Sequence, residues 1–280
     1  MKIFILGASG LIGSNIFDFL SHKTNHEVFG SYRTSKTLHT PHPKFSSNLF
    51  HYDFEDSMTE LSGLLDGIRP DIVINAMGIT KHIDEVRTKV IRVNSIFPHE
   101  LAQISSKLGI RLIHISTDCV FTGKKGMYIE SDLPDATDLY GRSKILGEVN
   151  YDKHLTVRIS TIGKEITSKH GLLEWFLAAE NSCLGYKKAI FSGLPSKYFA
   201  DALNRFIFPC PEITGLYHIS SIPVDKFTLL QKLATFYNKN IEIISNEEFV
   251  IDRSLDSSSF ANKTGFIAPS WGNLISTEWL

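Results

Sequence analysis

The chain has 280 residues, of which 42% are hydrophobic and 21% are charged, as is typical of a globular protein in water. Lys and Arg together number 29 and Asp and Glu 30, so the net charge is -1, whereas a nucleic-acid-binding protein normally carries a basic surface. The 3 cysteines show no metal-ligand spacing and favour a reducing compartment. No stretch approaches the roughly 18 apolar residues of a membrane helix. We therefore expect a cytoplasmic protein that binds no nucleic acid, membrane or metal.

Predicted strands and helices alternate through the first half of the chain. Runs of β-branched and aromatic residues predict strands, and apolar residues at three- and four-residue spacing predict helices. The strands are expected at 2–6, 27–32, 49–52, 71–76, 111–116 and 155–159, and the helices at 11–21, 56–65, 88–107 and 138–149. This alternation is typical of βαβ units, which place helices on both faces of a parallel sheet. The fold class is therefore α/β, a Rossmann-type doubly wound parallel sheet over residues 1–160.

The pattern loosens after residue 160, where glycines and prolines interrupt it. Helices are expected at 171–180, 198–208 and 226–237, and short strands at 216–219 and 241–244. No repeat or low-complexity linker marks a boundary. We expect residues 161–280 to form mainly a smaller substrate-binding lobe that is interleaved with the Rossmann core.

A glycine-rich run, Gly7-Ala8-Ser9-Gly10-Leu11-Ile12-Gly13, lies between the first predicted strand and the first predicted helix. Gly7 would permit a tight turn, Gly10 a close approach of the backbone to a pyrophosphate, and Gly13 close packing of helix on strand. The free N–H groups at the start of the helix would face the anion. The run predicts a dinucleotide site, the alternative being a turn that binds nothing.

Two residues bear on which dinucleotide would bind. Arg33 follows the second predicted strand, where an acidic residue would accept the 2′-hydroxyl of NAD, and an arginine can instead pair with the 2′-phosphate of NADP. This favours NADP, with NAD possible if Arg33 is only a surface residue. Asp53 ends the third strand and would either accept the adenine amino group or cap a turn.

Tyr140 and Lys144 stand four residues apart on a predicted helix, so their side chains share one face. The ammonium of Lys144 is expected to lower the pKa of Tyr140 and make it a better acid–base group. Thr117, at the end of a predicted strand, has a hydroxyl that could polarise a carbonyl. Lys81 and His82 follow the fourth strand and would either contact a diphosphate or be solvated.

Taken together, these motifs resemble the extended short-chain dehydrogenase/reductase family, of the dTDP-4-dehydrorhamnose reductase-like type. The resemblance rests on five motifs in order: Gly7 to Gly13, Asn75-Ala76, Arg92-Val93-Asn94, Ser116-Thr117-Asp118-Cys119-Val120-Phe121, and Tyr140-Gly141-Arg142-Ser143-Lys144. It implies that Tyr140 donates a proton to the substrate carbonyl, that Thr117 bonds this carbonyl, and that Lys144 tunes Tyr140 and bonds the nicotinamide ribose. Asn94 would support the lysine through water or satisfy buried backbone. Cys119 stands where the family usually has tyrosine, and we expect it to be a small core or pocket-wall residue and not a nucleophile.

The resemblance also implies the remaining expectations about function. The catalytic residues are Thr117, Tyr140 and Lys144, and the expected cofactor-binding residues are Gly7, Ser9, Gly10, Leu11, Ile12, Gly13, Arg33, Asp53, Phe54, Asn75, Ala76, Met77, Asn94, Tyr140 and Lys144. The reaction would be NAD(P)H-dependent reduction of a nucleotide-activated 4-keto-deoxysugar for cell-surface polysaccharide. A nucleotide-sugar epimerase or dehydratase, and a non-catalytic dinucleotide-binding regulatory subunit, are the alternatives. A homodimer is a possible assembly.

Overall fold

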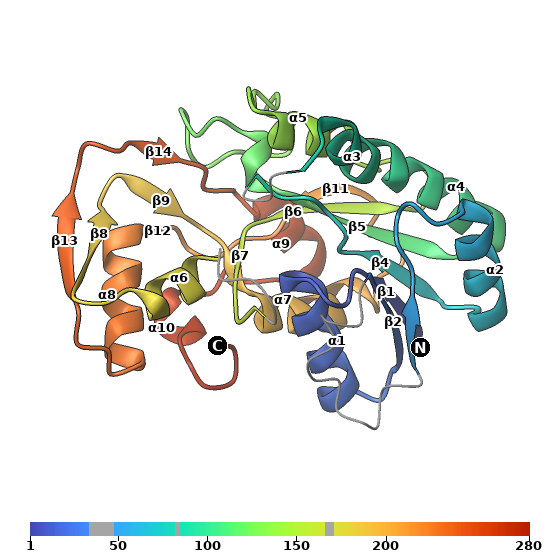
Figure 1. The fold of residues 1–280 in the computed structure, drawn as a ribbon, viewed down its shortest axis with the longest axis horizontal. Coiled ribbons are helices and arrows are strands. Elements are labelled where there is room, and N and C mark those ends of the chain that lie inside the picture. The colour runs from blue at the N-terminus through green and yellow to red at the C-terminus, as the bar shows by residue number, and fades with distance from the viewer. Residues whose placement is uncertain (34–47, 82–84, 166–170) are drawn as a thin grey trace.

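The computed structural model describes residues 1–33, 48–81, 85–165 and 171–280 (Figure 1). Within these residues, the central feature is a seven-stranded sheet in the order β11-β6-β5-β4-β1-β2-β3, with every neighbouring pair parallel. Its strands are β1 (Lys2–Leu6), β2 (Glu27–Tyr32), β3 (Leu49–His51), β4 (Ile72–Asn75), β5 (Arg111–Thr117), β6 (Leu155–Ile159) and β11 (Gly215–His218). The chain reverses its direction of winding between β1 and β4, which confirms the predicted Rossmann-type fold.

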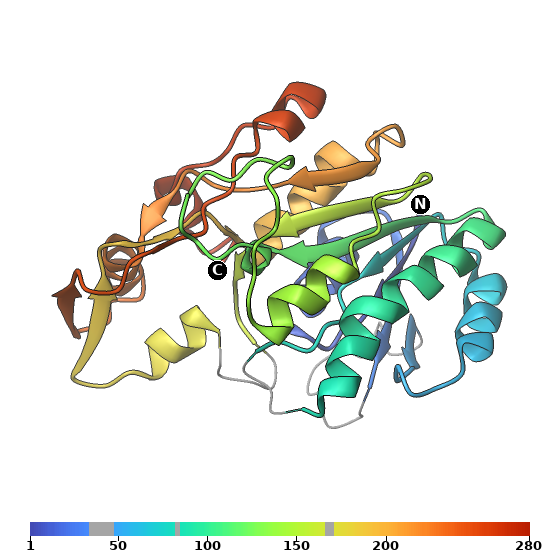
Figure 2. The same cartoon turned by 90° about the horizontal axis from the view of Figure 1, so that it is seen from above.

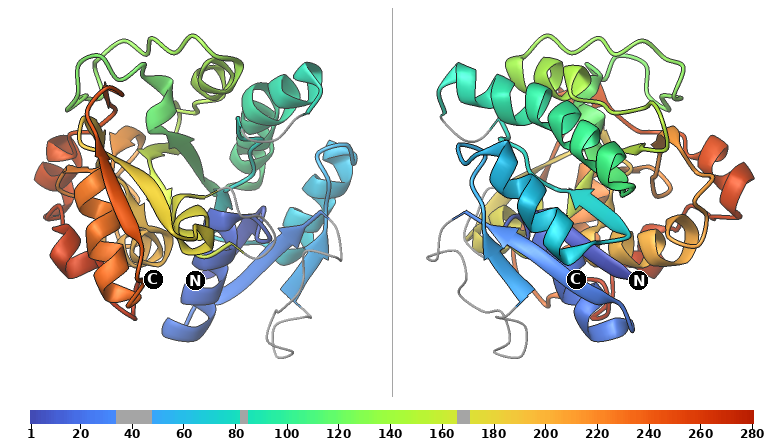
Figure 3. Two further views of the ribbon diagram at one scale, coloured as in Figure 1. Left: turned by 60° about the vertical axis from the view of Figure 1, so that its left-hand side comes forward. Right: turned by 90° about the vertical axis from the view of Figure 1, so that its right-hand side faces the viewer.

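Helices cover both faces of this sheet, as the views in Figures 2 and 3 show. One face carries α2 (Met58–Ile68), α3 (Arg87–Ile91), α4 (Phe97–Leu108) and α5 (Leu139–Leu146). The other carries α1 (Leu11–Lys23) and α7 (Ser196–Ala202), which pack against each other. Alternation along β1 divides the core accordingly. Ile3 and Ile5 pack on the α1 side, and Phe4 and Leu6 pack on the α2 and α4 side.

The long helix expected over much of 88–107 is present without a break, but its segment Arg92–Ile96, between α3 and α4, is π-helical. The wider turn lets two consecutive side chains, Asn94 and Ser95, both face α5. Asn94 Nδ2 donates to Ser143 Oγ (3.1 Å) and Ser95 Oγ donates to the Ser143 carbonyl (2.9 Å). Such π-segments are frequent at functional sites.

The second half of the chain divides between two layers. β11 joins the Rossmann sheet, α7 and α9 (Ser258–Thr264) pack on the sheet side, and most of the rest forms a smaller lobe beside it (Figure 1). The lobe contains α6 (Leu172–Ala178), α8 (Lys226–Phe236), α10 (Trp271–Leu274), β7 (Thr161–Ile162), β8 (Ser182–Tyr186), β9 (Ala189–Phe191), β10 (Leu194–Pro195), β12 (Val224–Asp225), β13 (Glu242–Asn246) and β14 (Ile251–Asp252). No helix in the described ranges combines the length and apolarity needed to cross a bilayer.

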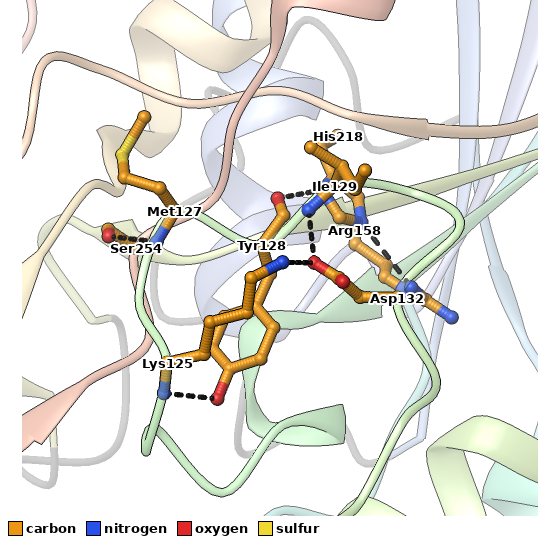
Figure 4. Close-up of polar contacts among 8 residues, drawn as sticks. All are labelled: Lys125, Met127, Tyr128, Ile129, Asp132, Arg158, His218 and Ser254. Atoms are coloured by element: carbon orange, nitrogen blue, oxygen red, sulfur yellow. Dashed lines mark hydrogen bonds and ion pairs between the residues drawn. The ribbon is translucent and has the colours of Figure 1, made fainter.

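A buried histidine, His218, ties β11 to the loop that precedes α5 (Figure 4). Its Nδ1 donates to the Tyr128 carbonyl (2.9 Å), and its Nε2 accepts from Arg158 Nη1 (3.3 Å). Burial, assisted by the nearby Arg158 charge, lowers the pKa of His218 to about 4. The same loop is fixed by Met127 N–H donating to Ser254 Oγ (2.8 Å).

The fold should therefore lose stability as the pH falls from about 6.5 to about 4. In this window the unfolded chain protonates His218 and the folded chain does not, so protons favour unfolding. Urea unfolding at pH 7, 6 and 5 measures this loss. His218→Gln should reduce the slope by up to about 1.4 kcal/mol per pH unit, the value for one proton. Equal slopes for the two proteins would contradict a neutral His218.

Candidate active site

The glycine-rich turn joins β1 to α1. Gly7 has a φ of +81°, a region that favours glycine, and its N–H donates to Ser31 Oγ (3.1 Å) on β2. A Cβ on Gly13 would lie 2.2 Å from the Gly7 carbonyl oxygen, so only glycine lets α1 approach the turn. Among the residues that the structure describes, a Cβ on Gly10 would meet only this oxygen, at 3.5 Å. The space outside Gly10 is thus open, and Gly10 itself starts α1 without a side-chain cap.

This turn has the features of an anion cradle. The first-turn N–H groups of a helix have no intrahelical acceptor, and the helix dipole favours negative charge there. Ser9, Leu11 and Ile12 are half-buried around the turn. Met77 lies against its far side, since a Cβ on Gly7 would be 3.1 Å from Met77 Cγ. The residues present therefore fit a bound pyrophosphate.

The residues predicted for the adenosine end differ in their placement. Arg33 is exposed just beyond β2, and the segment that follows it, 34–47, lies outside the described residues. Asp53 is half-buried, and its Oδ1 accepts the Glu55 N–H (3.3 Å) in the turn before α2. Phe54 is buried against Ile79 and the helix α3, as a core residue.

The three residues predicted to be catalytic come from β5 and α5. Thr117 is the last residue of β5, and its Oγ1 accepts the Cys119 N–H (3.1 Å). Asp138 caps α5 by accepting the Gly141 N–H (2.8 Å), which starts the helix just before Tyr140. The Thr117 hydroxyl donates to Asp118 Oδ1 (3.1 Å), and Thr117 lies close enough to Tyr140 to lower the pKa of its phenol.

Lys144 lies one helical turn after Tyr140 and is buried against β5. Its Nζ donates to the Ile115 carbonyl (2.7 Å) and contacts His114 Nε2 (3.2 Å). Burial lowers the pKa of Lys144 to about 8, and the Glu148 carboxylate partly offsets this effect.

The expected lowering of the Tyr140 pKa is wrong for the structure as it stands. Burial raises the pKa of Tyr140, the neighbouring Cys119 and Asp118 side chains add to the rise, and Thr117 opposes it. Lys144 Nζ donates instead to the Ile115 carbonyl of β5 (2.7 Å). Tyr140 is thus held in its protonated form.

Asn75 and Asn94 turn their side chains into the protein. Asn75 Oδ1 accepts the Met77 N–H (3.1 Å), and its Nδ2 contacts His114 Nδ1 (3.1 Å). Asn94 bonds both backbone groups of Ile79 at 2.9 Å, so it fixes the loop after β4. Ala76, which lies between Asn75 and Met77 in the sequence, is half-buried.

Three cations gather around Asp118 and Cys119, next to Thr117. Arg253 Nη1 donates to Cys119 Sγ (3.5 Å) and Nε to the Phe121 carbonyl (2.8 Å). Lys226, at the start of α8, interacts electrostatically with Arg253, Lys81 and both residues of the turn. Burial raises the pKa of the Cys119 thiol to about 11, so it is a poor nucleophile. His82, predicted beside Lys81, lies outside the described residues.

Sequence reasoning missed Lys226, Arg253 and His114. The first two come from the lobe, more than 100 residues away in the sequence, and no local motif marks them. His114 left a signal, since it is a polar residue between two isoleucines of a buried strand.

Known proteins share sequence similarity with the half of the chain that contains this site. The chain is 37% identical over 154 residues to the probable low-salt glycan biosynthesis reductase Agl14 of Haloferax volcanii, covering 53% of this chain and 48% of the relative. It is 29% identical over 150 residues to methionine adenosyltransferase 2 subunit beta of Bos taurus, covering 52% and 41%. The chain thus spans about half the length of the curated relatives it matches.

The solved structures agree on the fold. A dTDP-4-dehydrorhamnose reductase from Bacillus anthracis, in complex with NADP, superposes with a TM-score of 0.79 at 21% identity, covering 98% of this chain and 96% of that one. The family model described as the RmlD substrate binding domain matches residues 1–178, which include the glycine-rich turn, Thr117, Tyr140 and Lys144. The chain belongs to the RmlD substrate binding domain family.

Proposed function

We propose that the protein is an NADPH-dependent reductase of a nucleotide-activated 4-keto-deoxysugar, acting in the cytoplasm in polysaccharide biosynthesis. The observation that carries the proposal is the meeting of Thr117 and Tyr140 at the end of β5, with Lys144 one helical turn away. This end of β5 is two strands from the glycine-rich turn, at the same edge of the sheet. The reductase named among the relatives supports it.

The cofactor would be held by the glycine-rich turn and the start of α1. Bound NADPH would supply a hydride from its nicotinamide ring. The open space at Gly10 and the uncapped N-terminus of α1 suit its pyrophosphate. The exposed guanidinium of Arg33 suits a 2′-phosphate, which favours NADPH over NADH.

The side chains of this chain would then perform the proton chemistry. Thr117 and Tyr140 would both donate hydrogen bonds to the substrate carbonyl oxygen, stabilising the negative charge that develops there. Tyr140 would transfer its proton to this oxygen. A phenol whose pKa is raised stays protonated near neutral pH, as a proton donor requires. Lys144 would bond the ribose hydroxyls.

The three cations beside Cys119 would hold the anionic part of the substrate. Lys81, Lys226 and Arg253 bring three positive charges to a turn that carries one carboxylate, Asp118. A nucleotide sugar has a diphosphate next to the sugar, and clustered Lys and Arg side chains suit it. The lobe would thus recognise the diphosphate while β5 and α5 recognise the ketone.

A second candidate is a non-catalytic subunit that binds dinucleotide, which the relative named as a subunit of methionine adenosyltransferase favours. A panel of dTDP-, UDP-, GDP- and CDP-linked 4-keto sugars, followed by NADPH and NADH absorbance, separates the two. We expect turnover of at least one sugar, faster with NADPH. Cofactor binding without turnover of any sugar would favour the subunit.

Two glycine variants test the cofactor cradle against a purely structural role. Gly10→Ala should fold with near-normal stability, because its Cβ meets only the Gly7 oxygen at 3.5 Å, yet bind NADPH at least about tenfold more weakly. Gly13→Ala should lose folding stability first, because its Cβ would collide with the same oxygen.

Thermal melting and fluorescence titration with NADPH measure both effects. A Gly10→Ala protein that binds NADPH as tightly as the wild type would show that the pyrophosphate does not approach this position.

A further inference from the structure

His114 lies in the middle of β5 with no exposed surface, and both of its ring nitrogens have polar partners. Asn75 Nδ2 is 3.1 Å from Nδ1, and Lys144 Nζ is 3.2 Å from Nε2. A neutral imidazole has one donor and one acceptor nitrogen, so only one of these partners can be a donor. The surroundings decide which nitrogen carries the proton.

The orientation of the Asn75 amide fixes the tautomer. Asn75 Oδ1 accepts the Met77 N–H at 3.1 Å, so the NH₂ group of Asn75 faces His114. Nδ1 of His114 must therefore accept, and the ring proton sits on Nε2, facing Lys144. The only hydrogen-bond acceptor that Lys144 can offer to this proton is the lone pair of a neutral amine.

The remaining contacts of Lys144 are consistent with a neutral amine. Its Nζ donates to the Ile115 carbonyl at 2.7 Å, which an NH₂ group can do. Burial lowers the pKa of Lys144 to about 8, so the amine is neutral above this pH, and burial holds the pKa of His114 well below its usual value. Two other titratable groups act on the pair, Glu148 raising the pKa of Lys144 and His99 lowering that of His114.

We propose that His114 is a positioning residue, which donates Nε2–H to the neutral amine of Lys144 and links it through Asn75 to the backbone of the turn after β4. The assignment of a catalytic site to Lys144 rests on the function proposed above, but the hydrogen-bond chain does not. This series of hydrogen bonds runs from Met77 N–H to Asn75, to His114 and to Lys144, and Met77 lies against Gly7 of the cofactor turn.

This series of hydrogen bonds couples the protonation state of Lys144 to the cofactor turn. When Lys144 takes up a proton, Nε2 of His114 must become the acceptor and Nδ1 the donor. The Asn75 amide must then rotate to offer its oxygen, and the Met77 N–H loses its acceptor. Protonation of Lys144 and the hydrogen bond at Met77 therefore oppose each other.

The tautomer of His114 in the wild-type protein is the first test. Long-range ¹H–¹⁵N correlation spectra of ¹⁵N-histidine-labelled protein at pH 9.5 distinguish an Nε2–H from an Nδ1–H ring. The His114 signal is assigned by its absence from His114→Gln. We expect the Nε2–H form, and an Nδ1–H form would overturn the proposal.

A matched pair of variants supplies the second test. The amide of His114→Gln places a donor near the former Nε2, whereas the amide of His114→Asn replaces only the Nδ1 side. The measurement is the ¹³Cε chemical shift of Lys144 as a function of pH, whose midpoint gives the pKa of the amine. The signal is assigned by its absence from the spectrum of Lys144→Met. The midpoint should stay near its wild-type value in His114→Gln and rise by about one pH unit in His114→Asn.

A buried histidine outside the site, His154, provides the control, and His154→Asn should leave the Lys144 midpoint unchanged. Equal Lys144 midpoints in wild type, His114→Asn and His114→Gln would overturn the proposal. These readouts need neither substrate nor turnover, so failure of the reductase proposal would not decide them.

Discussion

The candidate site depends on the burial of one amine, Lys144 Nζ, against the backbone of β5. Its hydrogen bond to the Ile115 carbonyl ties α5 to the carboxyl end of the sheet. Two glycines allow α5 to come so close. A Cβ on Gly141 would lie 2.5 Å from the Cys119 carbonyl oxygen, and one on Gly147 would lie 1.9 Å from that of Asn94. Tyr140 is thereby placed on the same helix beside Thr117.

The same burial explains the electrostatics of the site. An amine that is taken out of water loses affinity for its proton, and a phenol beside it holds its proton more tightly. The raised pKa keeps Tyr140 protonated before it meets an oxygen that gains negative charge, as in reduction of a ketone. The cations from the lobe, Lys226 and Arg253, then face the turn that follows Thr117.

The sequence predicts the Rossmann half well because its signals are local. β1, β2 and β6 have the predicted bounds, and the buried strands carry apolar runs that need no knowledge of their partners. The lobe was predicted less completely. β9 is only three residues long and pairs with β12 and β14, more than 30 residues away, so its formation depends on contacts that no local pattern records.

The site divides in the same way. The glycine-rich turn, Thr117, Tyr140 and Lys144 follow from motifs whose spacing is set by a single turn or helix. The direction of the Tyr140 pKa could not be predicted, because it depends on burial and on which atom the Lys144 amine contacts. The amide orientation of Asn75, and with it the tautomer of His114, requires the packing of β4 against β5.

The most direct test of Tyr140 as the proton donor is a single-turnover measurement of NADPH oxidation by Tyr140→Phe with the 4-keto sugar that the wild type reduces. The change removes one hydroxyl and should preserve the packing of α5, so NADPH affinity should be unchanged. The rate should fall by about 10²–10⁴-fold, the usual contribution of general acid catalysis. Tyr151→Phe, at an exposed tyrosine, is the control. A rate for Tyr140→Phe close to that of the wild type would contradict the account.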